Sequence, residues 1–144
     1  MNQNDLYDFA EKNNIIIDEF PLKKALSLAI MDEDSDCFIA INSKRIETAS
    51  EKNERLMHEI GHCMTGSFYS RHTPLITRKK CEYRANKWAY ENYIPFDKLK
   101  KAMQECCDSF EELADYFGVT AEFVYKAYTY YMEIKGLTFF ENEN

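Results

Sequence analysis

The run from His58 to His62 constrains the fold of this chain more than any other feature of its sequence. It consists of His-Glu-Ile-Gly-His. Thr48 precedes the surrounding apolar pattern with a glutamate three residues later, which is the capping box that begins many helices. Residues four apart lie on the same face of a helix, so the two imidazoles can reach one metal ion while Glu59 projects beside them. The pattern therefore predicts a helix from about Thr48 to Gly66 that carries a metal site.

A catalytic zinc site needs a third protein ligand and one open coordination position. The side chains that could supply this ligand are His72, Cys81, Glu82, Glu91 and Asp97. We favour Glu82, because two alanines and Asn86 share its face on the helix predicted for residues 78–92. Small residues there would let this helix approach the histidine helix closely. Asn86 would then form a hydrogen bond with a ligating histidine.

The remaining patterns predict an α+β fold. A short helix ends near residue 13, and strands follow at 15–17, 25–31 and 37–41, the last two as a hairpin. Further helices are predicted at 97–106, 109–118 and 120–134. We expect a small sheet of about three strands beside the zinc-binding helix pair, a mainly helical C-terminal half, and a single domain over residues 1–144.

The composition limits the partners and the location. A net charge of -7 argues against direct nucleic-acid binding, because such binding depends on clustered cations. No apolar run approaches the ~20 residues of a membrane span, and the N-terminus is polar and acidic, so we expect a cytoplasmic monomer without a membrane partner. The cysteines form no C-x-x-C pair, and we expect reduced thiols at Cys37, Cys63, Cys81, Cys106 and Cys107.

A second motif follows the histidine run. It consists of Glu82-x-x-Ala85-Asn86-x-Trp88-Ala89 and a later Ile94-Pro95. Together the two parts resemble the ImmA/IrrE metallopeptidase family, and the likeness extends over about residues 15–130. The chain departs from the commonest family pattern at Trp88, where phenylalanine is usual, and at 93–95, where a leucine-rich approach to the proline is usual. Both departures conserve bulk.

The resemblance implies the roles of four residues. His58, His62 and Glu82 would bind one zinc ion in a gluzincin-like site, and Glu59 would be the catalytic base. The family further implies a zinc-dependent endopeptidase of phage or mobile-element type that cleaves a helix-turn-helix transcriptional repressor. The acidic composition suits such a basic partner.

Two other functions are compatible with the sequence. One is a non-proteolytic module that binds a repressor, or acts in a toxin-antitoxin-type pair, while retaining the metal. The presence of Glu59 argues against it, since a structural zinc site needs no base. The other is an interaction module in which residues 109–134 form a degenerate helix-turn-helix, although Lys126 is almost the only cation there that could reach a base.

Two details of a peptidase site stay open in the sequence. His72, Tyr69 or Tyr93 could stabilise the oxyanion, and the spacing does not choose among them. An edge strand commonly aligns the substrate in zinc peptidases, and we expect residues 37–42 to provide it. On that prediction, Ala40→Pro would impair substrate binding.

Overall fold

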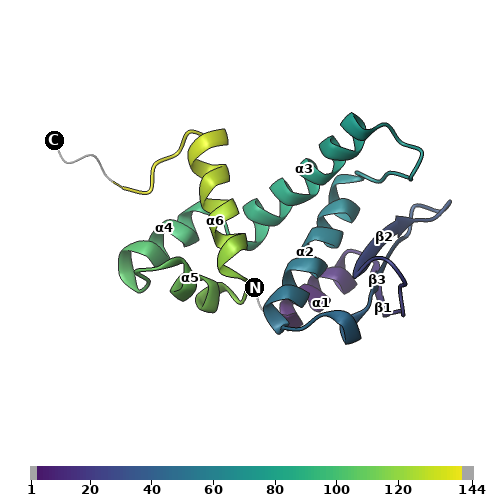
Figure 1. Cartoon of the computed structure of the whole chain (residues 1–144), viewed down its shortest axis with the longest axis horizontal. Helices are drawn as coiled ribbons and strands as arrows, with labels where there is room; N and C mark the ends of the chain where they lie inside the picture. The colour runs from purple at the N-terminus through teal and green to yellow at the C-terminus, as the bar shows by residue number, and fades with distance from the viewer. Residues whose placement is uncertain (1–2, 141–144) are drawn as a thin grey trace.

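The structure is a computed structural model that describes residues 3–140. It has the predicted α+β fold, with a small sheet at one end and a helical C-terminal half at the other (Figure 1). The elements in chain order are α1 (Gln3–Lys12), β1 (Ile15–Glu19), β2 (Ser27–Met31), β3 (Cys37–Ile41), α2 (Ala49–Thr65), α3 (Leu75–Tyr93), α4 (Phe96–Glu105), α5 (Phe110–Phe117) and α6 (Ala121–Thr129). A short 3-10 helix at Ser43–Arg45 lies between β3 and α2, and a π-helical turn at Tyr130–Ile134 extends α6. No helix among the described residues is both long and apolar enough to span a bilayer.

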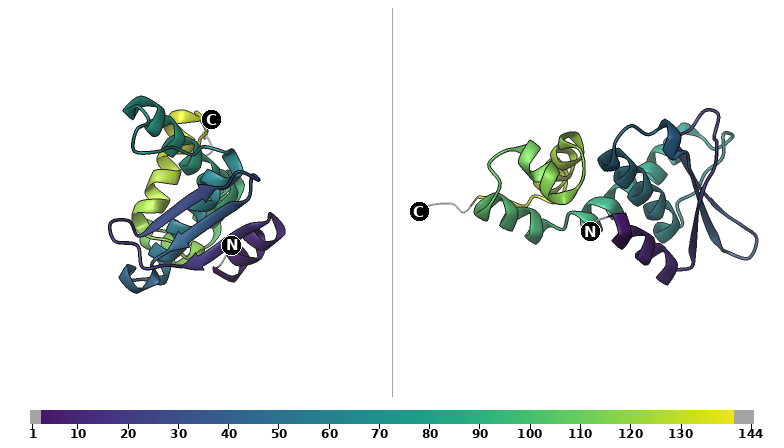
Figure 2. Two further views of the ribbon diagram at one scale, coloured as in Figure 1. Left: turned by 90° about the vertical axis from the view of Figure 1, so that its right-hand side faces the viewer. Right: turned by 90° about the horizontal axis from the view of Figure 1, so that it is seen from below.

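The three strands form a mixed sheet in the order β1-β3-β2. β3 runs parallel to β1 and antiparallel to β2, so the predicted hairpin of β2 and β3 is confirmed. Along β3, Cys37, Ile39 and Ile41 are buried while the side chains between them are partly exposed. This alternation directs every second side chain toward the helices, which lie behind the sheet in the left view of Figure 2.

The prediction that residues 37–42 form an edge strand is wrong. β3 is hydrogen-bonded on both sides, because β1 crosses over to pair with it in parallel. Proline at Ala40 would disrupt the centre of the sheet and would not test substrate binding. The edge strands are β1 and β2.

α2 lies alongside α3 and against the sheet (Figures 1 and 2). The side chain of Thr48 accepts a hydrogen bond from the backbone N–H of Glu51, and Gly66 ends the helix with a φ of 64°. Both bounds match the prediction. α3 begins at Leu75, three residues before the predicted start, because it follows Pro74 and has no capping side chain to mark its beginning in the sequence.

The C-terminal helices are attached to α2 through the turn between α5 and α6. Asn53 of α2 donates from Nδ2 to the carbonyl oxygen of Gly118 over 2.9 Å. The next residue, Glu54, accepts hydrogen bonds at Oε1 from the backbone N–H of Thr120, over 2.7 Å, and from its hydroxyl. Thr120 also caps α6. The helix that carries both histidines is therefore tied directly to the first turn of α6.

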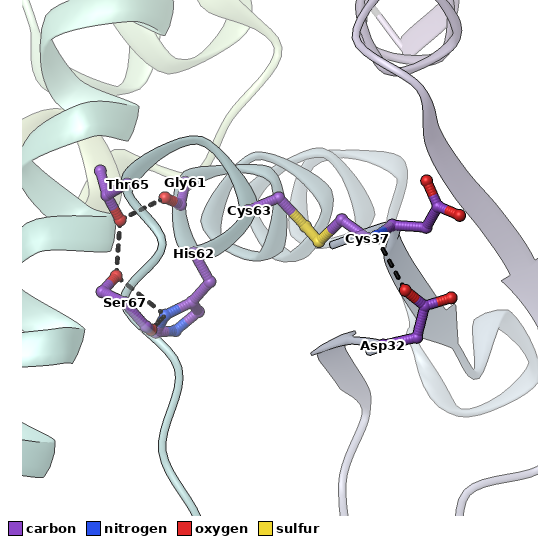
Figure 3. Close-up of a disulfide and its surroundings, with 8 residues drawn as sticks. Asp32, Cys37, Gly61, His62, Cys63, Thr65 and Ser67 are labelled. Carbon is purple, nitrogen blue, oxygen red and sulfur yellow. Dashed lines mark hydrogen bonds between the residues drawn. A yellow bond between two sulfur atoms is a disulfide. The ribbon is translucent and has the colours of Figure 1, made fainter. Parts of the chain in front are cut away.

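Cys37 of β3 and Cys63 of α2 form a disulfide, with their Cα atoms 6.0 Å apart (Figure 3). The expectation of reduced thiols is wrong for this pair, while Cys81, Cys106 and Cys107 are free. The two half-cystines are 26 residues apart, so their spacing gives no signal. They meet because α2 packs on β3.

Candidate metal centre

Two helices bring together the three side chains that the sequence singled out as metal ligands. His58 and His62 are one turn apart on α2, and their Nε2 atoms lie 3.1 Å from each other. The carboxylate of Glu82, on α3, lies 2.7 Å from Nε2 of His58 and 3.3 Å from Nε2 of His62. One ligand atom from each residue fits within 4.8 Å of the other two. Of the five candidates for the third position, Glu82 is the one that this group contains.

The outer ring nitrogens of both histidines are held by oxygen acceptors. Nδ1 of His58 donates to Oδ1 of Asn86 over 2.8 Å, as the sequence predicted. Nδ1 of His62 donates to the carbonyl oxygen of Ser67 over 2.6 Å (Figure 3). These bonds hold a proton on Nδ1 of each ring and turn Nε2 toward Glu82, where it could bind a metal ion in its unprotonated form. The partner of His62 was missed because a loop carbonyl leaves no mark in the sequence.

A close approach of α2 and α3 sets the spacing between the histidines and the glutamate. Gly61 faces Ala85, and a Cβ added at Gly61 would lie 2.6 Å from the carbonyl oxygen of Ala85. Such a separation is well inside van der Waals contact. Glycine is therefore needed at position 61 so that α2 can pack against α3. Ala85 allows the close approach of the two helices that the sequence predicted.

Glu59 lies beside this group and is largely buried, with 7% of its surface exposed. It lines the same hollow as His58 and His62. Burial raises the pKa of its carboxyl group, although the two nearby imidazoles act in the opposite direction. Glu59 is thus a carboxyl group that is shielded from bulk water and adjacent to the three converging ligand atoms.

The charges within the group complement one another. Hydrogen bonds from His58 and His62 hold the pKa of Glu82 well below its usual range. Burial alone would lower the pKa of His62, but its bonds to Glu82 and to the Ser67 carbonyl raise it overall. An anionic carboxylate therefore faces two imidazoles, and a divalent cation could take the place of the protons they share.

Of the three residues considered for the oxyanion, only Tyr69 contacts the group. Its hydroxyl donates to Oε1 of Glu82 over 2.6 Å, and this bond raises the pKa of Tyr69 to about 12. Tyr93 is buried in the core with 2% of its surface exposed. His72 lies in an exposed loop, where Nε of Arg71 donates to it.

The group lies between two hollows. The first, of about 420 Å³, is bordered by Ser27, Leu28 and Ala29 of the edge strand β2. The second, of about 370 Å³, is bordered by residues of α6 and its cap, which are Thr120, Glu122, Phe123 and Lys126. Arg55, His58 and Glu82 line both hollows. A chain lying across the group would therefore touch the sheet edge on one side and α6 on the other.

This donor set fits a metal ion. Two imidazole nitrogens and one carboxylate oxygen are ligands that catalytic zinc commonly takes, and the adjoining hollows leave room for a fourth ligand. A family model described as Peptidase_M78, the IrrE N-terminal-like domain, matches residues 10–129. Comparisons with curated proteins and with solved structures find no match.

Proposed function

The chain belongs to the Peptidase_M78 family of IrrE N-terminal-like domains, and from this premise we propose that it is a zinc-dependent endopeptidase acting on a protein partner. The observation that carries the proposal is the convergence of His58, His62 and Glu82 beside the buried carboxyl group of Glu59. A binding module that retained the metal would need no acid next to the three ligands. The family and the geometry therefore support the same class of reaction.

In this proposal His58, His62 and Glu82 hold the zinc ion. The ion supplies a Lewis acid that polarises the scissile carbonyl and makes water more acidic. Glu59 takes a proton from the attacking water and then passes it to the leaving nitrogen. Glu59 follows His58 directly on α2, so the same helix places both the base and the two histidines. Asn86 and the Ser67 carbonyl keep the two imidazoles oriented.

Tyr69 acts as a positioning residue through Glu82. Its hydroxyl holds one oxygen of the carboxylate, so the carboxylate has a fixed orientation toward the histidines. The edge strand β2, in place of β3, aligns the substrate chain, because Ser27, Leu28 and Ala29 border the hollow next to Glu59. An extended peptide would add to the free side of β2.

The substrate we propose is a helix-turn-helix repressor in the cytoplasm, encoded with the peptidase on a phage or mobile element. The support for this choice is the net charge of -7, which favours a basic DNA-binding partner. α6 presents Lys126 as an exposed cation, and it is paired with Glu122 over 3.1 Å. This pairing argues against direct DNA binding by α6 itself.

Metal content tests the proposal first. Elemental analysis should find about one zinc per chain in the wild type and in Glu59→Gln, and little in Glu82→Ala. A repressor from the neighbouring gene should be cleaved by the wild type alone. Wild-type protein that takes up no zinc after reconstitution would overturn the zinc site. Cleavage by Glu59→Gln would remove Glu59 as the base, and an intact repressor with zinc bound would exclude that substrate.

A further inference from the structure

Two neighbouring free thiols lie at the end of α4. The Sγ atoms of Cys106 and Cys107 are 3.1 Å apart and do not form a disulfide. Cys106 is exposed, whereas Cys107 is buried with 7% of its surface accessible. Neither residue lines the hollows at the metal centre. The pair therefore offers one accessible and one sheltered sulfur that a single atom could bridge.

An apolar hollow of about 280 Å³ adjoins the pair. Cys107 lines it together with four apolar side chains, which are Met103, Phe110, Leu113 and Phe140. Asp108 and Ser109 complete the lining. A group attached to an atom held by the thiols could enter this hollow, and the lining favours an apolar or aromatic group.

The surroundings do not suit an ordinary metal ion. Among residues 3–140, the group of three or more side chains that could bind a metal ion consists of His58, His62 and Glu82. It includes neither Cys106 nor Cys107. Zinc would lack two of its usual four ligands at Cys106 and Cys107. Two sulfurs suit a sulfur-binding atom that forms three bonds and already carries an organic group on one of them. Trivalent organic arsenic has this form.

We propose that Cys106 and Cys107 form a binding site for trivalent arylarsenicals, with the aryl group in the adjoining hollow. An arylarsine oxide would lose its oxygen to water as the two S–H bonds break and two As–S bonds form. The arsenic stays trivalent, so no oxidant or reductant is needed. The exposed Cys106 reacts first, and the second bond then closes within the molecule.

The close spacing of the sulfurs favours this second step. Burial and the neighbouring Cys106 raise the pKa of Cys107 to about 11, so Cys107 keeps its proton and is a poor nucleophile by itself. Once arsenic is attached to Cys106, the reaction becomes intramolecular and has a high effective concentration. The pair should therefore retain arsenic far better than either thiol alone. This site is independent of the peptidase proposal.

Intact-mass measurement of the full chain tests the site, with phenylarsine oxide as the probe. The folded protein is treated with one equivalent and then challenged with excess 2-mercaptoethanol. We expect one phenylarsenic group per chain to be retained and to be removed by 2,3-dimercaptopropanol. Cys106→Ser should retain about 10²-fold less, because one thiol cannot chelate. Since Cys106 is exposed, this variant should fold. Cys107→Ser should retain as little arsenic as Cys106→Ser, with circular dichroism used to show that this variant is folded.

Two controls locate the arsenic. Cys81→Ser removes the remaining free thiol and should retain as much arsenic as the wild type. Retention in Cys106→Ser would place the adduct on other sulfurs, such as Cys37 and Cys63 after reduction of their disulfide, and would overturn the proposal. Loss of retention in Cys81→Ser would overturn it as well. A phenyl adduct should also resist dimercaptopropanol longer than a methyl adduct, and the reverse order would refute the placement in the hollow.

Discussion

Replacing Gly61 by alanine would press α2 against α3 beside the metal centre. The added Cβ would lie 2.6 Å from the carbonyl oxygen of Ala85 and 3.1 Å from its Cα atom. Both are backbone atoms, so no side chain can rotate to relieve the contact. The two helices would have to separate, and Glu82 would move away from His58 and His62.

The size of the effect follows from two opposing contributions. Overpacking of a well-packed contact costs about 1–3 kcal/mol. Alanine in place of glycine inside a helix stabilises it by about 1 kcal/mol. Gly61→Ala should therefore lower the free energy of unfolding by up to about 2 kcal/mol, with a fall in Tm of up to roughly 8 °C. Zinc affinity should fall more clearly, by about 10-fold or more, because the ligand spacing changes.

Denaturation of the metal-free protein and zinc competition with a chelator measure the two effects separately. Gly66→Ala is the matched control. Gly66 has a φ of 64°, and a Cβ there meets nothing within 4 Å. The control should lose about 1 kcal/mol through backbone strain and keep its zinc affinity. If Gly61→Ala binds zinc as the wild type does and is equally or more stable, the contact with Ala85 does not set the ligand spacing.

Three further predictions concern stability. Among the described residues, the buried hydroxyl of Tyr93 has no hydrogen-bond partner, so Tyr93→Phe should leave the free energy of unfolding unchanged or raise it by up to about 1 kcal/mol at pH 7. Burial raises the pKa of Tyr93 to about 12, so the Tyr93 hydroxyl loses its proton at a lower pH in the unfolded chain than in the folded one. Urea titrations should therefore show the free energy of unfolding of the wild type falling as the pH rises from about 10 toward 12. The fall should be smaller in Tyr93→Phe. Thr120→Ala removes the side-chain cap of α6 and the hydrogen bond from the Thr120 hydroxyl to Glu54, while the bond from the backbone N–H stays. Urea denaturation should show a loss of about 1–2 kcal/mol. Replacing Cys37 and Cys63 by serine should cost up to about 3–4 kcal/mol in thermal unfolding without reductant, and reduced wild-type protein should match the variant if the disulfide is the cause.

The helices and the convergence of His58, His62 and Glu82 could be predicted because their determinants are local. The caps at Thr48 and Gly66 fix the bounds of α2, and the four-residue spacing fixes the relation of His58 to His62. Glu82 followed from the small residues on its face, which predict a close helix neighbour. Each of these signals lies within one helix, and the family motif adds to them.

Features that depend on pairing between distant segments could not be predicted. The sequence shows that residues 37–41 form a strand, but the central position of β3 depends on the crossover of β1. The disulfide of Cys37 depends on which face of α2 meets that strand. The carbonyl of Ser67 holds His62 because of the loop path after α2, and a backbone group has no side-chain signature.

Three contacts along α2 fix the orientation of His58 and His62. Near its beginning α2 holds the turn before α6 through Glu54. Toward its end Gly61 lies against α3 and Cys63 is bonded to β3. Turning α2 by one residue would rotate each side chain by about 100° and break all three contacts together. His58 and His62 therefore keep their orientation through contacts that involve no metal.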